Sequence, residues 1–143
     1  MKKFTLSLLV FCAVLTVTAH AQHAMTAGEK INVTKNPLQV IFTKIINTPE
    51  IKDQEVKMVI VPFAPGEVSG AHRHPIPTIA YVLQGSISST FEGKTHVYKQ
   101  GEAFWEDPNG LHAESKNMSK TKEAKLLVFF IGPKGVPFIT PAK

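Results

Sequence analysis

The sequence predicts an all-β fold of antiparallel strands, either a closed barrel or a sandwich. Beyond residue 30, short runs rich in β-branched and aromatic residues alternate with Gly, Pro, Asn and Asp, and helical periodicity is absent. About eight such runs fall within roughly 95 residues, which suits a jelly roll, because its closure leaves little exposed strand edge. We expect one domain with a single hydrophobic core.

Each expected strand is bounded by residues that favour turns. In chain order, the expected strands are 38–46, 56–63, 78–83, 86–91, 95–98, 103–105, 112–117 and 126–131. The turn signals lie at 65–66, 75–77, 85, 92–94, 100–101, 107–110 and 132–133. Glycine permits positive φ angles and proline fixes φ near −65°, so these positions favour reversals of the chain over continued strands.

The N-terminus has the pattern of an export signal. Lys2 and Lys3 precede an apolar run from residue 4 to 17, and the triplet Ala19-His20-Ala21 follows as a cleavage motif. The run is shorter than the roughly 20 residues that a membrane-spanning helix needs, which favours cleavage over a retained anchor. The expected organisation is a signal peptide at 1–21, a partly disordered segment at 22–37 and the folded domain at 38–143. The mature protein is then expected to be periplasmic or secreted, without a membrane partner.

The charge balance is mildly basic and gives little support to nucleic-acid binding. The formal net charge is +5, and two of the contributing lysines lie in the expected signal peptide. Lysines gather only around residues 116–125, where no aromatic side chain interleaves to stack on bases. We expect this stretch to be a solvated loop and nucleic acid not to be a partner.

Three histidines form the strongest candidate site. His72 and His74 are two residues apart in an extended stretch, so their side chains project from the same face. Such pairs also arise by chance at protein surfaces. His112 follows the turn at 107–110, on a strand that a barrel can fold back beside the pair. Neutral imidazole binds several divalent metals well, and three such ligands leave open positions for water or substrate.

The spacing around the histidine pair resembles the first motif of the cupin superfamily. Gly66, five further residues, the histidine pair at 72–74 and then Gly85 follow the order and spacing of that motif. The resemblance implies a small single-domain cupin, whose strands form an antiparallel jelly-roll barrel, or double-stranded β-helix. It covers roughly residues 56–131.

The sequence also resembles a second cupin motif, but less completely. The matching residues are Gly101, Pro108, His112 and Asn117. Asp107 and Asn109 stand where the family usually has proline and glycine, and Asn117 comes one place late.

Thr78 stands where the first motif usually carries a glutamate. A neutral hydroxyl is a weak ligand compared with a carboxylate, so the resemblance implies a three-histidine site for one divalent metal ion. The identity of the ion stays open among Fe, Mn, Zn, Ni and Cu. Thr78 is either an ordinary strand residue or a hydrogen-bonding partner of a metal-bound water or a substrate oxygen.

Strand alternation gives an expected pocket. If Thr78 faces inward with His74, then the residues two and four positions later also face inward, and the residues between them face outward. The expected pocket lining is Thr78, Ala80, Val82 and Phe104, with one of Phe129 or Phe130 as a further wall. Plain core packing is the alternative for these aromatic residues. The outward face, with Tyr81, would suit a homodimer interface.

Four other residues are weaker candidates. Glu106 and Glu114 flank the turn before His112, and either could orient an imidazole or carry a proton, although a solvated carboxylate is the simpler interpretation. Arg73 lies between two ligand histidines and must point away from them. His96 stands alone in an expected hairpin strand and is better explained as an exposed or core histidine.

Three functions remain open. A three-histidine centre resembles those of cupin dioxygenases, which implies a metal-dependent oxidoreductase that acts on a small organic molecule. The alternatives are a non-catalytic module that binds a small ligand or metal, and a structural relic whose histidines bind nothing. Open coordination without a carboxylate favours the enzyme, whereas the absence of a recognisable acid and base pair favours the binding module.

Overall fold

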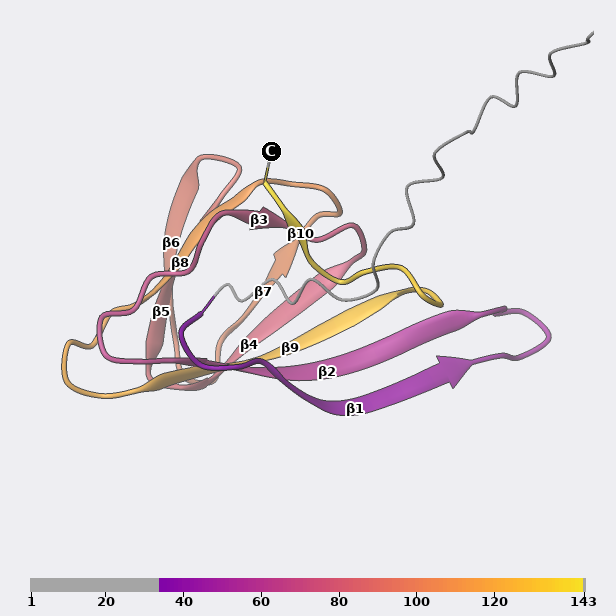
Figure 1. The fold of residues 1–143 in the computed structure, drawn as a ribbon, viewed down its shortest axis with the longest axis horizontal. Helices are drawn as coiled ribbons and strands as arrows, with labels where there is room; N and C mark the ends of the chain where they lie inside the picture. The colour runs from indigo at the N-terminus through magenta and orange to yellow at the C-terminus, as the bar shows by residue number, and fades with distance from the viewer. Residues whose placement is uncertain (1–33, 143) are drawn as a thin grey trace, which may run out of the picture.

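The computed structural model describes residues 34–142 and confirms the expected all-β, antiparallel jelly-roll fold. Ten strands form two five-stranded sheets, which diverge from one side of the molecule as seen in Figure 1. The expected signal peptide and most of the expected N-terminal segment lie outside the described residues. Within the described part of the chain, no helix is long and apolar enough to cross a membrane.

Each sheet draws its strands from distant parts of the sequence. The first sheet has the order β1 (Gln39–Ile46), β2 (Gln54–Phe63), β9 (Ala124–Pro133), β4 (Thr78–Gln84) and β7 (Ala103–Glu106). The second has the order β10 (Thr140–Pro141), β3 (His72–Arg73), β8 (His112–Asn117), β5 (Ser86–Phe91) and β6 (Lys94–Lys99). Strands β1, β2 and β9 run beyond the second sheet to one end of the molecule (Figure 1).

All eight expected strands are present, and their ends agree with the expected ones to within two residues. The sequence pattern did not reveal β3 and β10, because a strand of two residues is too short to show any alternation. These two strands pair with each other, and β3 also pairs with β8. The missed strands therefore lie where the candidate histidines lie.

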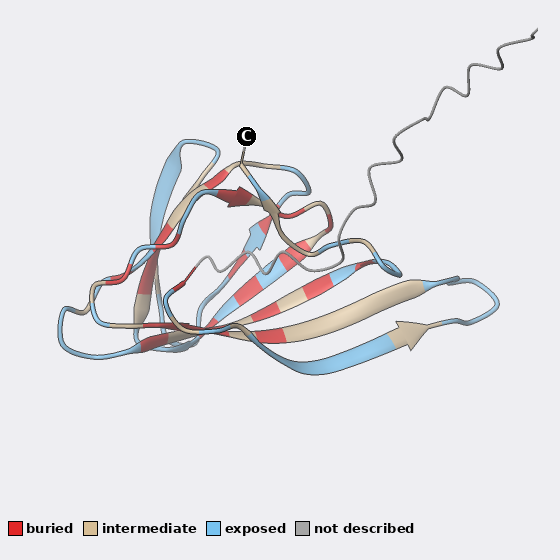
Figure 2. Ribbon diagram, in the orientation of Figure 1, coloured by how far each residue is buried: buried red, intermediate tan, exposed pale blue. Residues whose placement is uncertain are grey.

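Side-chain alternation places the core between the two sheets. Along β4, Thr78, Ala80 and Val82 are buried, whereas Ile79 and Tyr81 are exposed, as the period of a half-buried strand requires. Strand β9 alternates in the same way, and Figure 2 shows the buried positions as regular bands along both strands. The buried apolar core comprises Val59, Val61, Phe63, Ile76, Ala80, Val82, Ile87, Phe104, Ala124, Leu126, Val128 and Phe130.

Gly85 forms the tight connection between β4 and β5. Its φ angle is +80°, which glycine adopts without strain. A Cβ atom here would also lie 3.0 Å from the Cβ of Ala124. The glycine that the first motif carries at this position is therefore required both by the backbone conformation and by close packing against β9.

The first described residues are attached to the folded body. Thr34 is buried, and the Lys35 backbone N–H donates to the carboxylate of Glu67. Glu67 is itself buried and also accepts from the Ala64 N–H at 2.6 Å. This carboxylate thus joins the segment before β1 to the loop after β2.

Candidate metal centre

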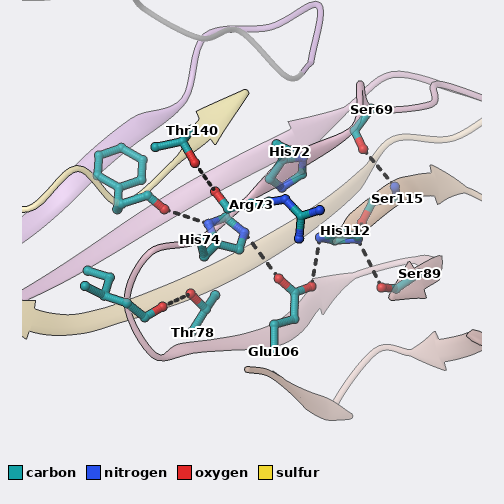
Figure 3. A network of polar contacts seen from close by, with 12 residues as sticks. Ser69, His72, Arg73, His74, Thr78, Ser89, Glu106, His112, Ser115 and Thr140 are labelled. Carbon is teal, nitrogen blue, oxygen red and sulfur yellow. Dashed lines mark hydrogen bonds and ion pairs between the residues drawn. The ribbon is translucent and has the colours of Figure 1, made fainter. Parts of the chain in front are cut away.

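The three candidate histidines meet between the two sheets. His72 on β3 is the direct cross-strand partner of His112 on β8, and His74 follows β3 on the same side of the chain. All three side chains are buried, and one nitrogen from each lies within 4.8 Å of the others. Figure 3 shows the three rings turned toward a common region.

Backbone carbonyls fix the tautomers of two of these histidines. His72 Nδ1 lies 2.8 Å from the Gly70 carbonyl oxygen, and His74 Nδ1 lies 2.6 Å from the Phe138 carbonyl oxygen. A carbonyl oxygen only accepts hydrogen bonds, so each Nδ1 must carry the proton. The Nε2 atoms of both rings then keep a free lone pair, which is what metal binding requires.

Two serine hydroxyls hold the third ring. His112 Nε2 lies 3.1 Å from Ser89 Oγ and 3.0 Å from Ser115 Oγ. Ser69 supports this arrangement, because its hydroxyl accepts from the Ser115 backbone N–H at 2.7 Å. A hydroxyl can accept as well as donate, so the ring can keep its proton on Nε2 and leave Nδ1 free to bind a metal.

A buried carboxylate completes the cluster. Glu106 ends β7 in the opposite sheet and is only 2% exposed. Its Oε1 lies 2.9 Å from His112 Nδ1, and its Oε2 lies 3.2 Å from His74 Nε2 (Figure 3). Nevertheless, Glu106 Oε2 and His112 Nδ1 have no hydrogen-bond partner among the residues that the structure describes. Such orphaned buried polar atoms are rare in folded proteins and point to a missing partner.

Burial and mutual contacts set the protonation states of this cluster. Burial lowers the pKa of His72 to about 4, although its bond to the Gly70 carbonyl acts in the opposite direction, so the ring is neutral at pH 7. Burial alone would raise the pKa of Glu106, but its contacts with His112 and His74 outweigh that effect and lower the pKa to about 2. The site therefore combines a neutral His72 imidazole with an ionised carboxylate.

The cluster lines part of a small cavity of about 40 Å³, which holds only a few water-sized groups. Its walls are mainly apolar, and the C-terminal segment before β10 forms part of them. The lining residues are Leu38, Val59, Val61, Phe63, His72, His74, Ala80, Glu106, His112, Ser115, Leu126, Val128, Phe130, Phe138 and Ile139.

The donor set fits a divalent metal ion. Three buried imidazole nitrogens and one carboxylate are common ligands of zinc, manganese and iron. One of the two orphaned atoms, Nδ1 of His112, belongs to this group of three histidines, and the other, Oε2 of Glu106, lies 3.2 Å from His74 Nε2, so both would gain a partner from a cation bound here. Three histidines of this chain could therefore hold a metal ion.

The sequence matches the cupin domain over residues 59–130. This range contains both histidine motifs and most of the two sheets. The chain belongs to the cupin family. No curated protein sequence is similar enough to count as a relative.

Several solved structures share this cupin fold. An oxalate oxidase is 29% identical with a TM-score of 0.53, and the match covers 61% of this chain and 46% of that chain. An oxalate oxidase in complex with the substrate analogue glycolate is 30% identical with a TM-score of 0.52, and the match covers 59% and 45%. An RmlC-like cupin from Shewanella frigidimarina is 18% identical with a TM-score of 0.51, with coverages of 76% and 89%, and shows the fold alone. The cupin chain described here spans less than half the length of the oxalate oxidases.

Only some of the expected pocket residues line the cavity. Ala80 lines the cavity, and of the two candidate phenylalanines Phe130 lines it while Phe129 faces outward. Thr78, Val82 and Phe104 are buried but do not line it. Alternation identified the inner face correctly, yet it does not say how far along that face the cavity extends.

Two of those residues have other partners. The Thr78 hydroxyl donates to the Ile76 carbonyl at 3.0 Å. The Phe104 ring stacks on Tyr98 at a centroid distance of 4.3 Å, so it serves as core packing. Of the four expected pocket residues, the structure places Ala80 at this cavity and the other three in the surrounding core.

The weaker candidates separate into one site residue and three others. Glu106 belongs to the cluster, whereas Glu114 is partly exposed on β8 and has no contact with the histidines. His96 is exposed on β6. Arg73 donates to the Asn109 carbonyl oxygen at 2.5 Å and does not contribute a ligand. Glu106 had a usable signal, because it has the same strand parity as the buried Phe104.

The residues that depart from the second cupin motif fit their local structure. Asn109 has a φ angle of +62°, and asparagine tolerates this left-handed conformation better than most residues in place of glycine. Asp107 accepts from the Trp105 indole N–H at 2.7 Å. The Asn117 amide donates to the carbonyls of Ala64 at 3.0 Å and Lys122 at 2.8 Å, so it joins loops and lies outside the metal site.

Proposed function

We propose that this cupin binds one divalent metal ion through His72, His74 and His112 and acts as an oxidoreductase on a small organic molecule. The observation that carries the proposal is the convergence of three buried imidazoles, two of them with Nε2 left free by carbonyl bonds at Nδ1. A bound metal would supply a Lewis acid that polarises an oxygen atom of the substrate.

The residues of the chain would perform the remaining tasks. The Gly70 and Phe138 carbonyls fix the orientation of two ligand rings, and Ser89 and Ser115 fix the third. The apolar walls would exclude bulk water, which strengthens electrostatic interactions within the cavity. A cavity of about 40 Å³ favours a substrate of only a few heavy atoms.

The comparisons support a small carboxylic acid as the substrate. The two oxalate oxidase structures are of chains 29–30% identical to this cupin, and one of them is a complex with glycolate. Acids of two or three carbons are of the size that the cavity favours, and a carboxylate oxygen is a good ligand for a hard divalent metal. The substrate class of this chain is inferred from that similarity and from the size of the cavity.

A second candidate is a non-catalytic cupin that binds a metal or small ligand. One observation favours it: no lysine, arginine or tyrosine side chain lines the cavity formed by the described residues. The Glu106 carboxylate, the one acidic group in the lining, already faces two of the histidines. A free proton carrier is therefore lacking at this site.

Metal analysis and an oxidation assay test the proposal. Elemental analysis of the protein purified from its native host should give about one divalent ion per chain. His74→Ala should lose most of this metal, whereas the matched control His96→Ala, which changes an exposed histidine, should keep it. The loaded protein should consume oxygen with oxalate, glycolate or a related small acid. Metal-free protein from the native host would refute metal binding, and tight metal binding without oxidation would favour the second candidate.

We also propose that the protein is exported and cleaved after Ala21. The basic start, the apolar run to residue 17 and the Ala19-His20-Ala21 triplet support this proposal. Mass spectrometry of the exported protein should then find Gln22, or its cyclised form, as the first residue. An exported protein that retains Met1 would contradict it.

We propose in addition that the outer face of the first sheet forms a homodimer interface. One row of cross-strand partners runs over all five strands of this face, through Trp105, Ile79, Phe129, Met58 and Phe42. The row contains no charged residue, and Trp105 is 51% exposed. A continuous apolar row of this kind is typical of a surface that a second copy can cover.

A further inference from the structure

A threonine and a glutamate on the neighbouring strands β4 and β7 bear on metal binding. Thr78 on β4 and Glu106 on β7 are direct cross-strand partners in the antiparallel pair. Their side chains share one face of the sheet, where such partners have Cβ atoms about 4.5–5.5 Å apart. Both are almost fully buried, at 1% and 2% exposed. A carboxylate at either of these two positions would therefore lie on the same face of the sheet.

Only one of the two side chains reaches the histidines. The Thr78 hydroxyl donates to the Ile76 carbonyl and does not line the cavity. The Glu106 carboxylate lines the cavity and contacts His74 and His112 with one oxygen each. Thus Thr78, where the first motif usually has glutamate, carries no carboxylate, whereas its cross-strand neighbour Glu106 does.

The atoms that face each other at this point require a cation between them. His74 carries its proton on Nδ1, because that atom lies against the Phe138 carbonyl. Its Nε2 lone pair therefore faces a carboxylate oxygen of Glu106 at 3.2 Å. Two acceptors at this distance repel each other, so in the metal-free protein a proton must lie between them, and a metal ion can take the place of that proton. The orphaned state of Glu106 Oε2 and His112 Nδ1 has the same explanation.

We propose that Glu106 is the carboxylate ligand of the metal site, supplied from β7 in place of the glutamate that the first cupin motif carries at Thr78. This inference rests on the proposed metal site. The ligand set is then three imidazoles and one carboxylate, with one negative charge. A carboxylate favours harder divalent ions, so Glu106 should contribute more to the affinity for Mn²⁺ than to the affinity for Zn²⁺.

Calorimetric titration of Mn²⁺ and Zn²⁺ into the chelator-stripped protein tests this ligand. Glu106→Gln keeps the shape but removes the charge, and should weaken Mn²⁺ binding about 100-fold and Zn²⁺ binding about 10-fold. Thr78→Val, the matched control on the neighbouring strand, should change both affinities by less than about 3-fold, because its hydroxyl is turned away from the cavity. The double variant Thr78→Glu, Glu106→Thr returns the acid to β4 and should recover most of the Mn²⁺ affinity.

The outcomes separate this inference from the proposed function. If the parent protein binds neither ion, the proposed metal site itself fails. If the parent binds Mn²⁺ and Glu106→Gln binds it equally well, the site stands and the ligand inference is overturned. Restored Mn²⁺ binding in the double variant would exclude a general loss of folding as the cause of the Glu106→Gln defect.

The affinity for Mn²⁺ separates a ligand from a residue that merely positions the histidines. In the metal-free protein, Glu106→Gln should be less stable than the parent, because it removes the carboxylate contacts with His74 and His112. Lower metal-free stability together with unchanged Mn²⁺ affinity would assign Glu106 a positioning role and overturn the inference. In a crystal structure of the Mn²⁺-loaded parent, a carboxylate oxygen of Glu106 should be bonded to the ion.

Discussion

At the site, the surroundings of individual side chains move their pKa values away from the ordinary ones. The pKa of His72 falls to about 4 because burial disfavours the imidazolium form. The pKa of Glu106 falls to about 2 because its histidine contacts outweigh the effect of burial. Both groups therefore bind fewer protons in the folded protein than in the unfolded chain.

This difference predicts acid sensitivity in the metal-free protein. His72 has a folded pKa of about 4 and an unfolded value near 6.5, so the unfolded state takes up its proton first as the pH falls. Stability should decrease below pH 6.5, and Glu106 should extend the loss between pH 4.5 and about 2. Urea unfolding at a series of pH values with chelator present would measure the effect.

His72→Gln provides the control for this prediction, because it removes the buried imidazole and should flatten the upper part of the pH dependence. The exposed His96 offers a matched variant, and His96→Ala should leave the curve of the parent protein unchanged. Equal stability of the metal-free parent protein at pH 7 and pH 5 would contradict the prediction.

At the scale of elements, the short C-terminal strand β10 matters more than its length suggests. It pairs with β3, where Thr140 and Pro141 lie opposite Arg73 and His72. The segment leading to it carries Phe138, whose ring lies 4.8 Å from that of Phe130 and whose carbonyl orients His74. The end of the chain thus closes one side of the cavity.

Truncating Phe138, which forms part of the cavity wall, should destabilise the protein without removing a metal ligand. Phe138→Ala should cost about 2 kcal/mol of unfolding free energy, less than for a fully buried phenylalanine, because the ring is only partly buried. The Phe138 carbonyl is retained, so metal affinity should fall by less than the roughly 10-fold to 100-fold that the loss of a hydrogen-bond partner of a ligand histidine costs. Urea unfolding and metal titration check the two effects. A metal affinity as low as that of His74→Ala would show that this side chain has a larger role.

At the scale of the whole molecule, the two faces of the first sheet serve different purposes. The inner face forms the core and carries Glu106, whereas the outer face exposes the apolar row from Trp105 to Phe42. An antiparallel sheet often leaves one face in water, but that face is then usually polar.

The proposed dimer predicts a change in molecular mass when this row is charged. Trp105→Lys should convert a dimer to a monomer, because a buried unpaired charge at an interface is costly. Light scattering after size-exclusion chromatography measures the mass. Val97→Lys is the matched control, since Val97 is 52% exposed on β6 in the other sheet. A monomeric parent protein, or a dimer that persists in Trp105→Lys, would contradict the prediction.

The sequence by itself determined eight of the ten strands, the inner face and the three histidines. Strand position and side-chain alternation are local properties, so the run 78–84 shows its buried and exposed positions without knowledge of its neighbours. The His72 and His74 spacing and the position of His112 after a turn are local as well. The export of the chain and the identity of the metal stay predictions.

Only the tertiary structure decided which side chains share the site. Glu106 meets His74 because β7 pairs with β4, and the Phe138 carbonyl meets His74 because β10 pairs with β3. Alternation states which face a residue occupies, but neither which strand lies beside it nor in what register. Pairing and register come from packing between distant segments, so the carboxylate missing at Thr78 could be found across the sheet only once the chain was folded.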